Sequence, residues 1–233
     1  MASRSPSLEA SYERFYASRT SPRVYPTEFV VRTLLANYPG LNFRKPGAGA
    51  RILDVGFGDG RNTAFLCDQG FAVSGIEIAQ GIVDRTSARL AQLGHTPDLR
   101  VGRNSRIPFE DGYFDGILAC HSCYYCDEGE LFVDNLREYA RVLKRGGSLI
   151  ASIAARSSYI FEGAVECPDG SFVIANDPYG NRNGYRLQAF GRECDIEECM
   201  SPFFGDFSFG FADNNYYGVS ERVFWVVCER RRS

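Results

Sequence analysis

The sequence predicts an α/β protein in which helices cover both faces of a mostly parallel sheet. Three observations lead to this fold class. Short apolar runs alternate with stretches of helical spacing from residue 51 to residue 153. A glycine-rich turn follows the first of these apolar runs directly. Strands that alternate with helices form parallel sheets covered on both faces. Two further apolar runs near the C-terminus, joined by a short loop, predict an antiparallel pair at one edge.

The individual elements follow from apolar periodicity and from turn-forming residues. Strands are predicted at 51–55, 71–76, 98–101, 114–119 and 147–153, and then at 207–211 and 222–229. Helices are predicted at 27–35, 60–69, 82–93 and 131–143. The periodic pattern weakens between residues 154 and 190, and residues 176–184 within this stretch are dense in Asn, Asp, Gly and Pro, which favours a long irregular segment of the kind that often forms a functional loop.

Composition narrows the class of protein. The 233 residues are 44% hydrophobic and 24% charged, which is typical of a folded domain with a substantial core. A formal net charge of −3 argues against a strongly basic surface for nucleic acid. No apolar run reaches the roughly 20 residues of a membrane span, and the segment Met1 to Glu9 lacks the apolar stretch of a signal peptide. We therefore expect a cytoplasmic protein.

The turn after the first strand is the most specific motif. Its three glycines, Gly56, Gly58 and Gly60, have the spacing G-x-G-x-G, and Asp54 lies two residues before the first of them. A dinucleotide-binding turn requires G-x-G-x-x-G, whose last glycine would fall at Arg61, and the P-loop requires a Gly-Lys-Ser/Thr that is absent. Such turns bind ligands at the carboxyl edge of the sheet. A carboxylate at Asp54 suits a ligand that carries an ammonium group.

A second acid, Glu77, ends the second predicted strand. A carboxylate in that place can accept hydrogen bonds from both hydroxyls of a ribose. The sequence therefore predicts two carboxylates at neighbouring strand tips, one for an amino-acid end and one for a sugar.

These motifs resemble those of the class I S-adenosylmethionine-dependent methyltransferases of the small-molecule type, over roughly residues 50–155. Residues 54–60 resemble the first motif of the family, Glu77 its ribose acid, residues 103–115 its adenine loop and fourth strand, and residues 143–149 its lead into strand five. Arg103 stands where small-molecule members commonly carry Asp. The resemblance implies a Rossmann-like, seven-stranded, mostly parallel sheet with one antiparallel strand, and S-adenosylmethionine as the cofactor.

The resemblance also implies a division of labour within one domain, 1–233. Residues 1–45 would form an N-terminal helical cap, 46–155 the cofactor-binding core, and 156–233 a substrate cap loop with the C-terminal antiparallel strands. The cofactor would be held by residues of the first motif, the second strand tip, the adenine loop and the cap. These are Asp54, Gly56, Gly58, Gly60, Glu77, Ile78, Asn104, Ser105, Tyr16, Tyr25 and Arg32. For the last three, ordinary helix packing is the alternative.

The segment after the fourth strand contains Cys120, Cys123 and Cys126 beside His121. This spacing is also found in iron–sulfur and zinc sites, but a fourth ligand is missing nearby. We predict no metal, and we expect the segment to line a pocket instead. In this family the segment faces the acceptor, so His121, Tyr124 and Tyr125 are the predicted catalytic residues. His121 would act as a general base or would only shape the pocket.

The acceptor itself would be bound by polar and aromatic residues of the cap. The candidates are Asp177, Tyr179, Arg182, Asn215 and Tyr216. Arg182 could hold a carboxylate or phosphate through its planar guanidinium. The alternative for each single residue is that it only stabilises a turn.

The predicted function is methyl transfer from S-adenosylmethionine to an oxygen or nitrogen of a polar small molecule, by in-line displacement. A cofactor-binding partner or regulator without activity is the alternative. A nicotinamide-dependent dehydrogenase is disfavoured by the glycine spacing. We expect a small-molecule substrate, no nucleic acid and no membrane partner, and the sequence is compatible with a homodimer.

Overall fold

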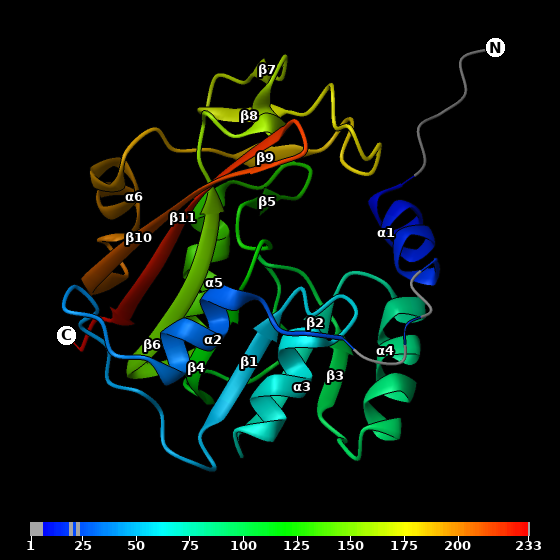
Figure 1. Ribbon diagram of the computed structural model, residues 1–233. Coiled ribbons are helices and arrows are strands. Elements are labelled where there is room, and N and C mark those ends of the chain that lie inside the picture. The colour runs from blue at the N-terminus through cyan, green and yellow to red at the C-terminus, as the bar shows by residue number, and fades with distance from the viewer. Residues whose placement is uncertain (1–6, 19–20, 22–23, 233) are drawn as a thin grey trace.

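The computed structural model describes residues 7–18, 21 and 24–232, and it contains a seven-stranded sheet, a smaller second sheet and helices on both faces of the first (Figure 1). The large sheet has the strand order β10-β11-β6-β4-β1-β2-β3. The small sheet lies above the ends at which β4 and β6 finish. Residues 1–6, on which the signal-peptide argument rests, lie outside the described part of the chain.

The large sheet is parallel apart from one strand. Its members are β1 (Arg51–Val55), β2 (Ala72–Glu77), β3 (Asp98–Val101), β4 (Phe114–Ala119), β6 (Leu143–Ala154), β10 (Phe204–Tyr216) and β11 (Val219–Arg230). β11 runs antiparallel to both of its neighbours, β6 and β10. The predicted sheet is therefore confirmed, although β6, β10 and β11 are each longer than expected.

Helices cover both faces of the large sheet, and successive side chains of its strands point alternately to one face and the other. The helices are α1 (Leu8–Ala17), α2 (Glu28–Leu35), α3 (Arg61–Asp68), α4 (Gln80–Gln92), α5 (Phe132–Val142) and α6 (Glu193–Met200), with a short 3-10 helix at Tyr159–Phe161. In β1, Ile52 packs in the cluster of α2 and α3, whereas its neighbour Leu53 packs in the cluster of α5 and α6. This period of two is the pattern of a strand covered on both faces.

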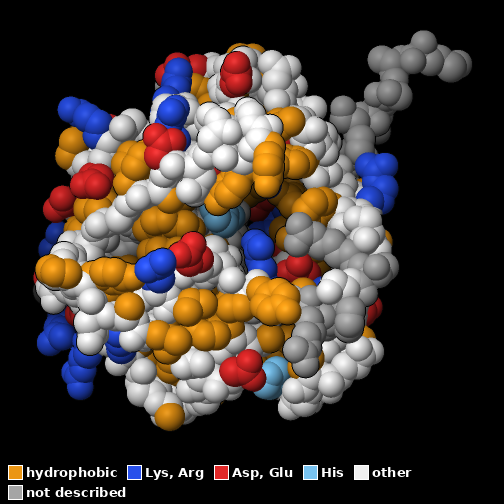
Figure 2. Space-filling model, in the orientation of Figure 1, with side chains coloured by type: hydrophobic (Ala, Val, Ile, Leu, Met, Phe, Trp, Pro, Cys, Tyr) orange, Lys and Arg blue, Asp and Glu red, His pale blue; other side chains and the backbone are white. Residues whose placement is uncertain are grey.

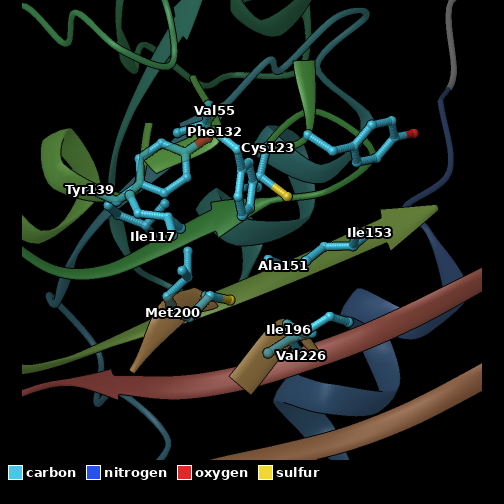
Figure 3. Packing of buried hydrophobic residues seen from close by; sticks show 14 of the residues in the cluster. Val55, Ile117, Cys123, Phe132, Tyr139, Ala151, Ile153, Ile196, Met200 and Val226 are labelled. Atoms are coloured by element: carbon cyan, nitrogen blue, oxygen red, sulfur yellow. The ribbon is translucent and has the colours of Figure 1, made fainter. Parts of the chain in front are cut away.

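The larger core cluster fills the space between the sheet and α5 and α6. Figure 3 shows Phe132 and Tyr139 of α5 together with Ile117 of β4 and Ala151 of β6, which belong to the same buried cluster. Cys123 belongs to this cluster and is 2% exposed, so it behaves as a small apolar side chain.

The second sheet is antiparallel and short, with β5 (Tyr125–Cys126), β7 (Val165–Glu166), β8 (Ser171–Val173) and β9 (Arg186–Gln188) in the order β5-β9-β8-β7. The segment 154–190 is thus more regular than the sequence predicted. Strands of two or three residues are too short to show an alternating pattern, and the turn formers lie between them. β5 follows β4 in the chain, so this sheet lies next to the edge at which β4 ends.

No helix within the described part of the chain is long and apolar enough to cross a membrane.

Core packing sets the first testable expectation. Phe114 of β4 is 0% exposed, whereas Phe211 of β10 is 49% exposed. Phe114→Ala should lower the free energy of unfolding by about 3–5 kcal/mol, because it leaves a cavity in a packed core. Chemical denaturation measures the change. Phe211→Ala is the matched control and should change stability by about 1 kcal/mol or less, and equal losses in the two variants would contradict the assigned core.

Candidate functional site

The glycine turn after β1 brings three elements into contact. Gly56, Gly58 and Gly60 have φ values of 68°, 55° and 78°, a left-handed region that favours glycine. A Cβ atom at Gly56 would lie 2.7 Å from Cβ of Ser122, which follows β4. A Cβ atom at Gly58 would overlap the hydroxyl of Tyr16 in α1. Both the backbone and the neighbours therefore require glycine at these two positions.

A cavity with a volume of about 90 Å³ lies beside this turn, at the tips of β1 and β2. We call it the strand-edge cavity. Its walls include Gly56, Glu77, Ile78, Asn104, His121, Tyr125 and Tyr16, which the sequence singled out. They also include Leu8, Tyr12, Val55, Ile76, Gly102, Arg103, Ser122 and Asp127. The structure therefore brings together residues from the first motif, the second strand tip, the adenine loop and the N-terminal cap.

Glu77 is the acid of this cavity. The backbone N–H of Gly58 donates to its Oε1 at 3.1 Å, and the backbone N–H of Ile78 donates to its Oε2 at 2.8 Å. Burial raises the pKa of Glu77 to about 7, although the two backbone donors act in the opposite direction. A carboxylate has about four lone-pair sites, so each oxygen can accept a further hydrogen bond from a ligand.

Asp54 is not among the described residues that line the cavity. It is 1% exposed, and the hydroxyl of Thr63 donates to its Oδ2 at 2.7 Å. Burial raises the pKa of Asp54 to about 6. In this structure Asp54 lies beneath the glycine turn and joins β1 to α3.

The adenine-loop candidates have different environments. The side-chain amide of Asn104 donates to the backbone carbonyl oxygens of Ser122 (2.9 Å) and Tyr125 (3.2 Å), and its oxygen accepts from the hydroxyl of Tyr139 at 2.8 Å. This side chain thus holds the segment after β4 in place. The hydroxyl of Ser105 is buried and has no hydrogen-bond partner among the described residues. Ser105 is not among the residues that line the strand-edge cavity.

Arg103, which stands in place of the usual acid, connects the cap to the sheet. Its guanidinium pairs with Asp127 at 2.6 Å and also with Glu9 of α1. Both Arg103 and Asp127 line the strand-edge cavity. The departure from the family pattern therefore serves to fix α1 across this cavity.

A second cavity, with a volume of about 340 Å³, lies between α1, the turn after β1, the segment after β4 and the 3-10 helix. We call it the cap cavity. Its aromatic wall residues are Tyr12, Phe15, Tyr16, Phe57, Tyr124, Tyr125 and Tyr159, and its charged ones are Asp59, Arg61, Arg182 and Glu221. Figure 2 shows a hollow near the centre of this face, bordered by hydrophobic side chains with acidic and basic side chains inside it. Five residues, Tyr12, Tyr16, Gly56, His121 and Tyr125, belong to the walls of both cavities, so the two spaces meet.

A hydrogen-bonded group that we call the clasp joins the cap elements over this junction. The hydroxyls of Tyr12 in α1 and Tyr125 in β5 are hydrogen-bonded to each other. The Nε of Arg182 donates to the Tyr125 hydroxyl at 2.8 Å, and its Nη1 donates to the Tyr159 hydroxyl at 3.2 Å. Arg182 also pairs with Asp177 at 3.6 Å. The guanidinium of Arg182 is therefore already occupied.

His121 lies where the two cavities meet. Its φ of 56° is unusual for a residue other than glycine, and its backbone N–H donates to the hydroxyl of Ser152 at 2.7 Å. Its ring meets that of Trp225 edge-on, with centroids 5.6 Å apart. Burial, together with the positive charges of Arg61 and Arg182, lowers the pKa of His121 to about 4. The imidazole is therefore neutral at neutral pH.

Several predicted residues are not brought to either cavity. Tyr25 is 75% exposed, and Arg32 is an exposed residue that pairs with Glu28 and donates to Tyr38. Tyr179 and Tyr216 are 57% and 52% exposed. The side-chain oxygen of Asn215 accepts from the backbone N–H of Gly218 in the turn between β10 and β11.

Asp177 likewise has a structural role. Its carboxylate accepts from the backbone N–H groups of Tyr179, Asn181 and Arg182 at 3.0–3.2 Å, which is the turn chemistry that its sequence context favours. Of the five predicted substrate residues, Arg182 is the one that lines the cap cavity.

The cysteine segment contributes packing. Cys123 and Cys126 are buried, and burial raises the pKa of the thiols of Cys126 (to about 11) and Cys120. Cys120 lines the cap cavity, and its sulfur donates to the hydroxyl of Thr27 at 3.6 Å. Within the described residues there is no group of three or more His, Cys, Asp or Glu side chains that could hold a metal ion.

Several cavity residues were not predicted from the sequence, among them Tyr12, Arg61, Tyr159 and Glu221. Spacing could have found the first, because Leu8, Tyr12 and Tyr16 recur every four residues and so share one face of α1. Arg61 could have been found from its place at the first position of α3, directly after Gly60. No local pattern marks Tyr159 or Glu221.

The strand order, the glycine turn and the acid at the tip of β2 define a class I methyltransferase fold. Residues 53–151 match the methyltransferase domain family. Together these findings show that residues 53–151 match a methyltransferase domain and that the chain is similar in fold to S-adenosylmethionine-dependent methyltransferases, the class that its motifs predict and whose cofactor is S-adenosylmethionine.

Similar proteins agree with this class. A solved structure of an S-adenosylmethionine-dependent methyltransferase from Methanosarcina mazei is 21% identical, covers 85% of this chain and 100% of its own, and has a TM-score of 0.60. The 1,6-didemethyltoxoflavin-N1-methyltransferase of Burkholderia thailandensis, solved with its substrate and S-adenosylhomocysteine, is 19% identical over 79% of this chain and 72% of its own, with a TM-score of 0.55. At these identities the structures show the fold.

Curated relatives match over part of their length. The ubiquinone biosynthesis O-methyltransferase of Maricaulis maris is 27% identical over 158 residues, which is 67% of this chain and 60% of that protein. An uncharacterized methyltransferase of Mycobacterium tuberculosis is 30% identical over 48% of this chain and 44% of its own. Other mycobacterial relatives match over 36% of their length.

The raised pKa of Glu77 makes a pH dependence testable. Because its folded pKa of about 7 lies above the ordinary glutamate value of 4.5, this group stabilises the ligand-free fold below about pH 4.5, and that stability is lost as the pH rises through about 7. The melting temperature of the wild type should therefore fall between about pH 5 and pH 8 by more than that of Glu77→Gln. Glu166→Gln, at an exposed acid outside both cavities, should behave as the wild type. Parallel melting curves of wild type and Glu77→Gln would contradict the assigned pKa.

The clasp can be tested by hydrogen exchange. Tyr125→Phe removes the hydroxyl that contacts both Tyr12 and Arg182, so the amides of α1 should exchange faster, by about threefold to tenfold for a lost hydrogen bond of about 1 kcal/mol. Tyr179→Phe is the matched control, because this ring is 57% exposed and lies outside both cavities. Unchanged exchange in α1 would show that the clasp does not hold the cap.

Proposed function

We propose that the protein transfers the methyl group of S-adenosylmethionine to an oxygen or nitrogen atom of a polar small molecule by in-line displacement. The observation that carries this proposal is the junction of the two cavities at Gly56, His121 and Tyr125. A donor held at the strand edge and an acceptor held under the cap would meet there. The named activities of the similar proteins from Maricaulis maris and Burkholderia thailandensis support a small-molecule acceptor.

The residues present fit such a donor. Glu77 retains acceptor capacity for ribose hydroxyls, and the backbone around Gly102 and Asn104 lines the strand-edge cavity where a base would lie. Gly56 lines this cavity and would present backbone without a side chain towards the amino-acid end, while Gly58 shapes the turn beside Tyr16. Asp54 would act beneath the turn, by fixing its shape through Thr63. The cavity of about 90 Å³ is smaller than the roughly 300 Å³ of typical ligand sites, so Tyr12 and Tyr16 of α1 would move aside on binding.

When bound, S-adenosylmethionine supplies a methyl group on a positively charged sulfur, which keeps the electron pair of the broken bond while a lone pair of the acceptor forms the new one. Because the leaving group is neutral and stable, the protein mainly has to align the acceptor and exclude water. The aromatic walls of the cap cavity serve the exclusion of water.

Neutral His121 would accept a hydrogen bond from the acceptor hydroxyl or amine and would thereby hold the acceptor lone pair in line with the methyl group. Tyr124 and Tyr125, whose rings stack with centroids 5.3 Å apart, would flank the acceptor.

Two measurements test the proposal. Isothermal titration should show binding of S-adenosylmethionine and S-adenosylhomocysteine and no binding of a nicotinamide dinucleotide. A product assay for S-adenosylhomocysteine over a panel of phenols, amines and carboxylic acids should then show acceptor-dependent turnover. Binding without turnover across the panel would favour the alternative, a cofactor-binding partner without activity.

The role of His121 has its own test. His121→Ala should leave the Kd for S-adenosylhomocysteine within about threefold and lower kcat by about tenfold or more, because a hydrogen bond to the acceptor is lost. With a pKa of about 4, His121 should cause no loss of rate between about pH 8 and pH 6. His95→Ala is the control, since His95 pairs with Asp68 outside both cavities. Full turnover in His121→Ala would remove this residue from the catalytic group.

A further inference from the structure

Two charged side chains in the wall of the cap cavity, Arg61 and Glu221, make no hydrogen bond or ion pair with any described residue. Their situation differs from that of Arg182, whose guanidinium is taken up by Tyr125, Tyr159 and Asp177. An unpaired charge that is partly removed from water is costly. A ligand with complementary charges would relieve this cost at both residues.

Arg61 supplies a positive site for an anionic group. It is the first residue of α3, where acidic side chains are normally favoured, and the first turn of this helix contains none. The arginine therefore adds its charge to the positive end of the helix instead of compensating it. Arg61 lines the cap cavity and is absent from the wall of the strand-edge cavity. This position assigns it to the acceptor side of the junction.

Glu221 supplies a negative site in the same cavity. It lies on β11 near the turn to β10. Burial raises the pKa of Glu221, and the charges of Arg182 and Arg61, which line the same cavity, oppose this rise. No ion pair within 4 Å joins Glu221 to either arginine in the described structure, which leaves its carboxylate open to an amine or another donor.

The rest of the cap-cavity wall is aromatic and favours a ligand with a flat apolar ring. Six rings of the cap cavity, those of Tyr12, Phe15, Tyr16, Tyr124, Tyr125 and Tyr159, come from α1, from the segment after β4 and from the 3-10 helix. Aromatic walls pack well against aromatic ligands through stacked and edge-on contacts.

We propose that the cap cavity binds a small aromatic zwitterion, whose anionic group lies against Arg61 and whose ammonium group lies against Glu221. This inference rests on the proposed function, because it names the class of acceptor that the methyltransferase takes. Arg61 and Glu221, which lie outside the motifs that would hold the donor, would then determine which acceptor binds.

Binding of matched probes tests the inference without turnover. Four compounds share a phenol ring and differ in charge: p-cresol is neutral, tyramine cationic, 4-hydroxyphenylacetate anionic and tyrosine zwitterionic. Each is titrated into the protein saturated with S-adenosylhomocysteine. Tyrosine should bind at least about tenfold more tightly than each of the other three, because it alone satisfies both charges.

Two variants assign the charges to residues. In Glu221→Gln tyrosine should lose its advantage over 4-hydroxyphenylacetate, and in Arg61→Met it should lose its advantage over tyramine. Matched controls are Glu229→Gln, an acid on the same strand that pairs with Arg232, and Arg137→Met, an exposed arginine of α5 that pairs with Asp134. Both controls should retain the wild-type order of the four probes. Melting curves confirm that each variant is folded. The comparison of the four probes on the wild-type protein does not depend on any variant.

The outcomes separate this inference from the function on which it rests. If S-adenosylhomocysteine itself does not bind, the proposed function fails. If it binds, but the four probes bind alike or none of them binds, the inference alone is overturned. A loss of affinity for S-adenosylhomocysteine in Arg61→Met, with the order of probes unchanged, would also overturn it, because the arginine would then serve the donor.

Discussion

The left-handed turn after β1 is the constraint on which the rest of the site depends. The N–H of Gly56 donates to the backbone carbonyl oxygen of Ile76 at 2.9 Å. The hydroxyl of Ser122 donates to the backbone carbonyl oxygen of Val55 at 2.6 Å. These bonds join the ends of β1, β2 and β4 into a single edge. A side chain at position 56 would collide with Ser122 and would displace the whole segment that carries His121 and Tyr125.

The segment after β4 is irregular, and amide side chains from other elements hold it. Asn135 of α5 donates to the carbonyl oxygens of Cys123 and Tyr125 at 3.0 and 2.8 Å, and Asn104 donates to those of Ser122 and Tyr125. Buried backbone groups outside regular structure need such partners. This support holds His121 with its positive φ between the two cavities, so its place is fixed before any ligand arrives.

Local patterns explain which parts of this arrangement the sequence could predict. β1 to β4, the glycine turn and Glu77 all rest on runs of a few residues with clear periodicity or spacing. The clasp does not, because its hydrogen bonds join residues 113 and 57 positions apart. The sequence marked Tyr25 as a contact because it is an N-terminal aromatic residue, but helical spacing places Tyr12 in the cavity wall and leaves Tyr25 exposed. The sequence predicts that the loop at Asn104 frames adenine; Asn104 lines the strand-edge cavity, and its side chain also supports the segment after β4.

Under the proposed function, the charge around His121 would limit how an acceptor could be activated. A pKa of about 4 already reflects burial and two nearby arginines, and a bound sulfonium would add a third positive charge. Full protonation of the ring is therefore unfavourable at the moment of transfer. The same field favours an acceptor that brings negative charge or needs no prior loss of a proton, such as a carboxylate, a phenolate or a neutral amine. In such a site the rate depends on holding lone pair, methyl group and sulfur in line, which is what a rigid segment between two cavities provides.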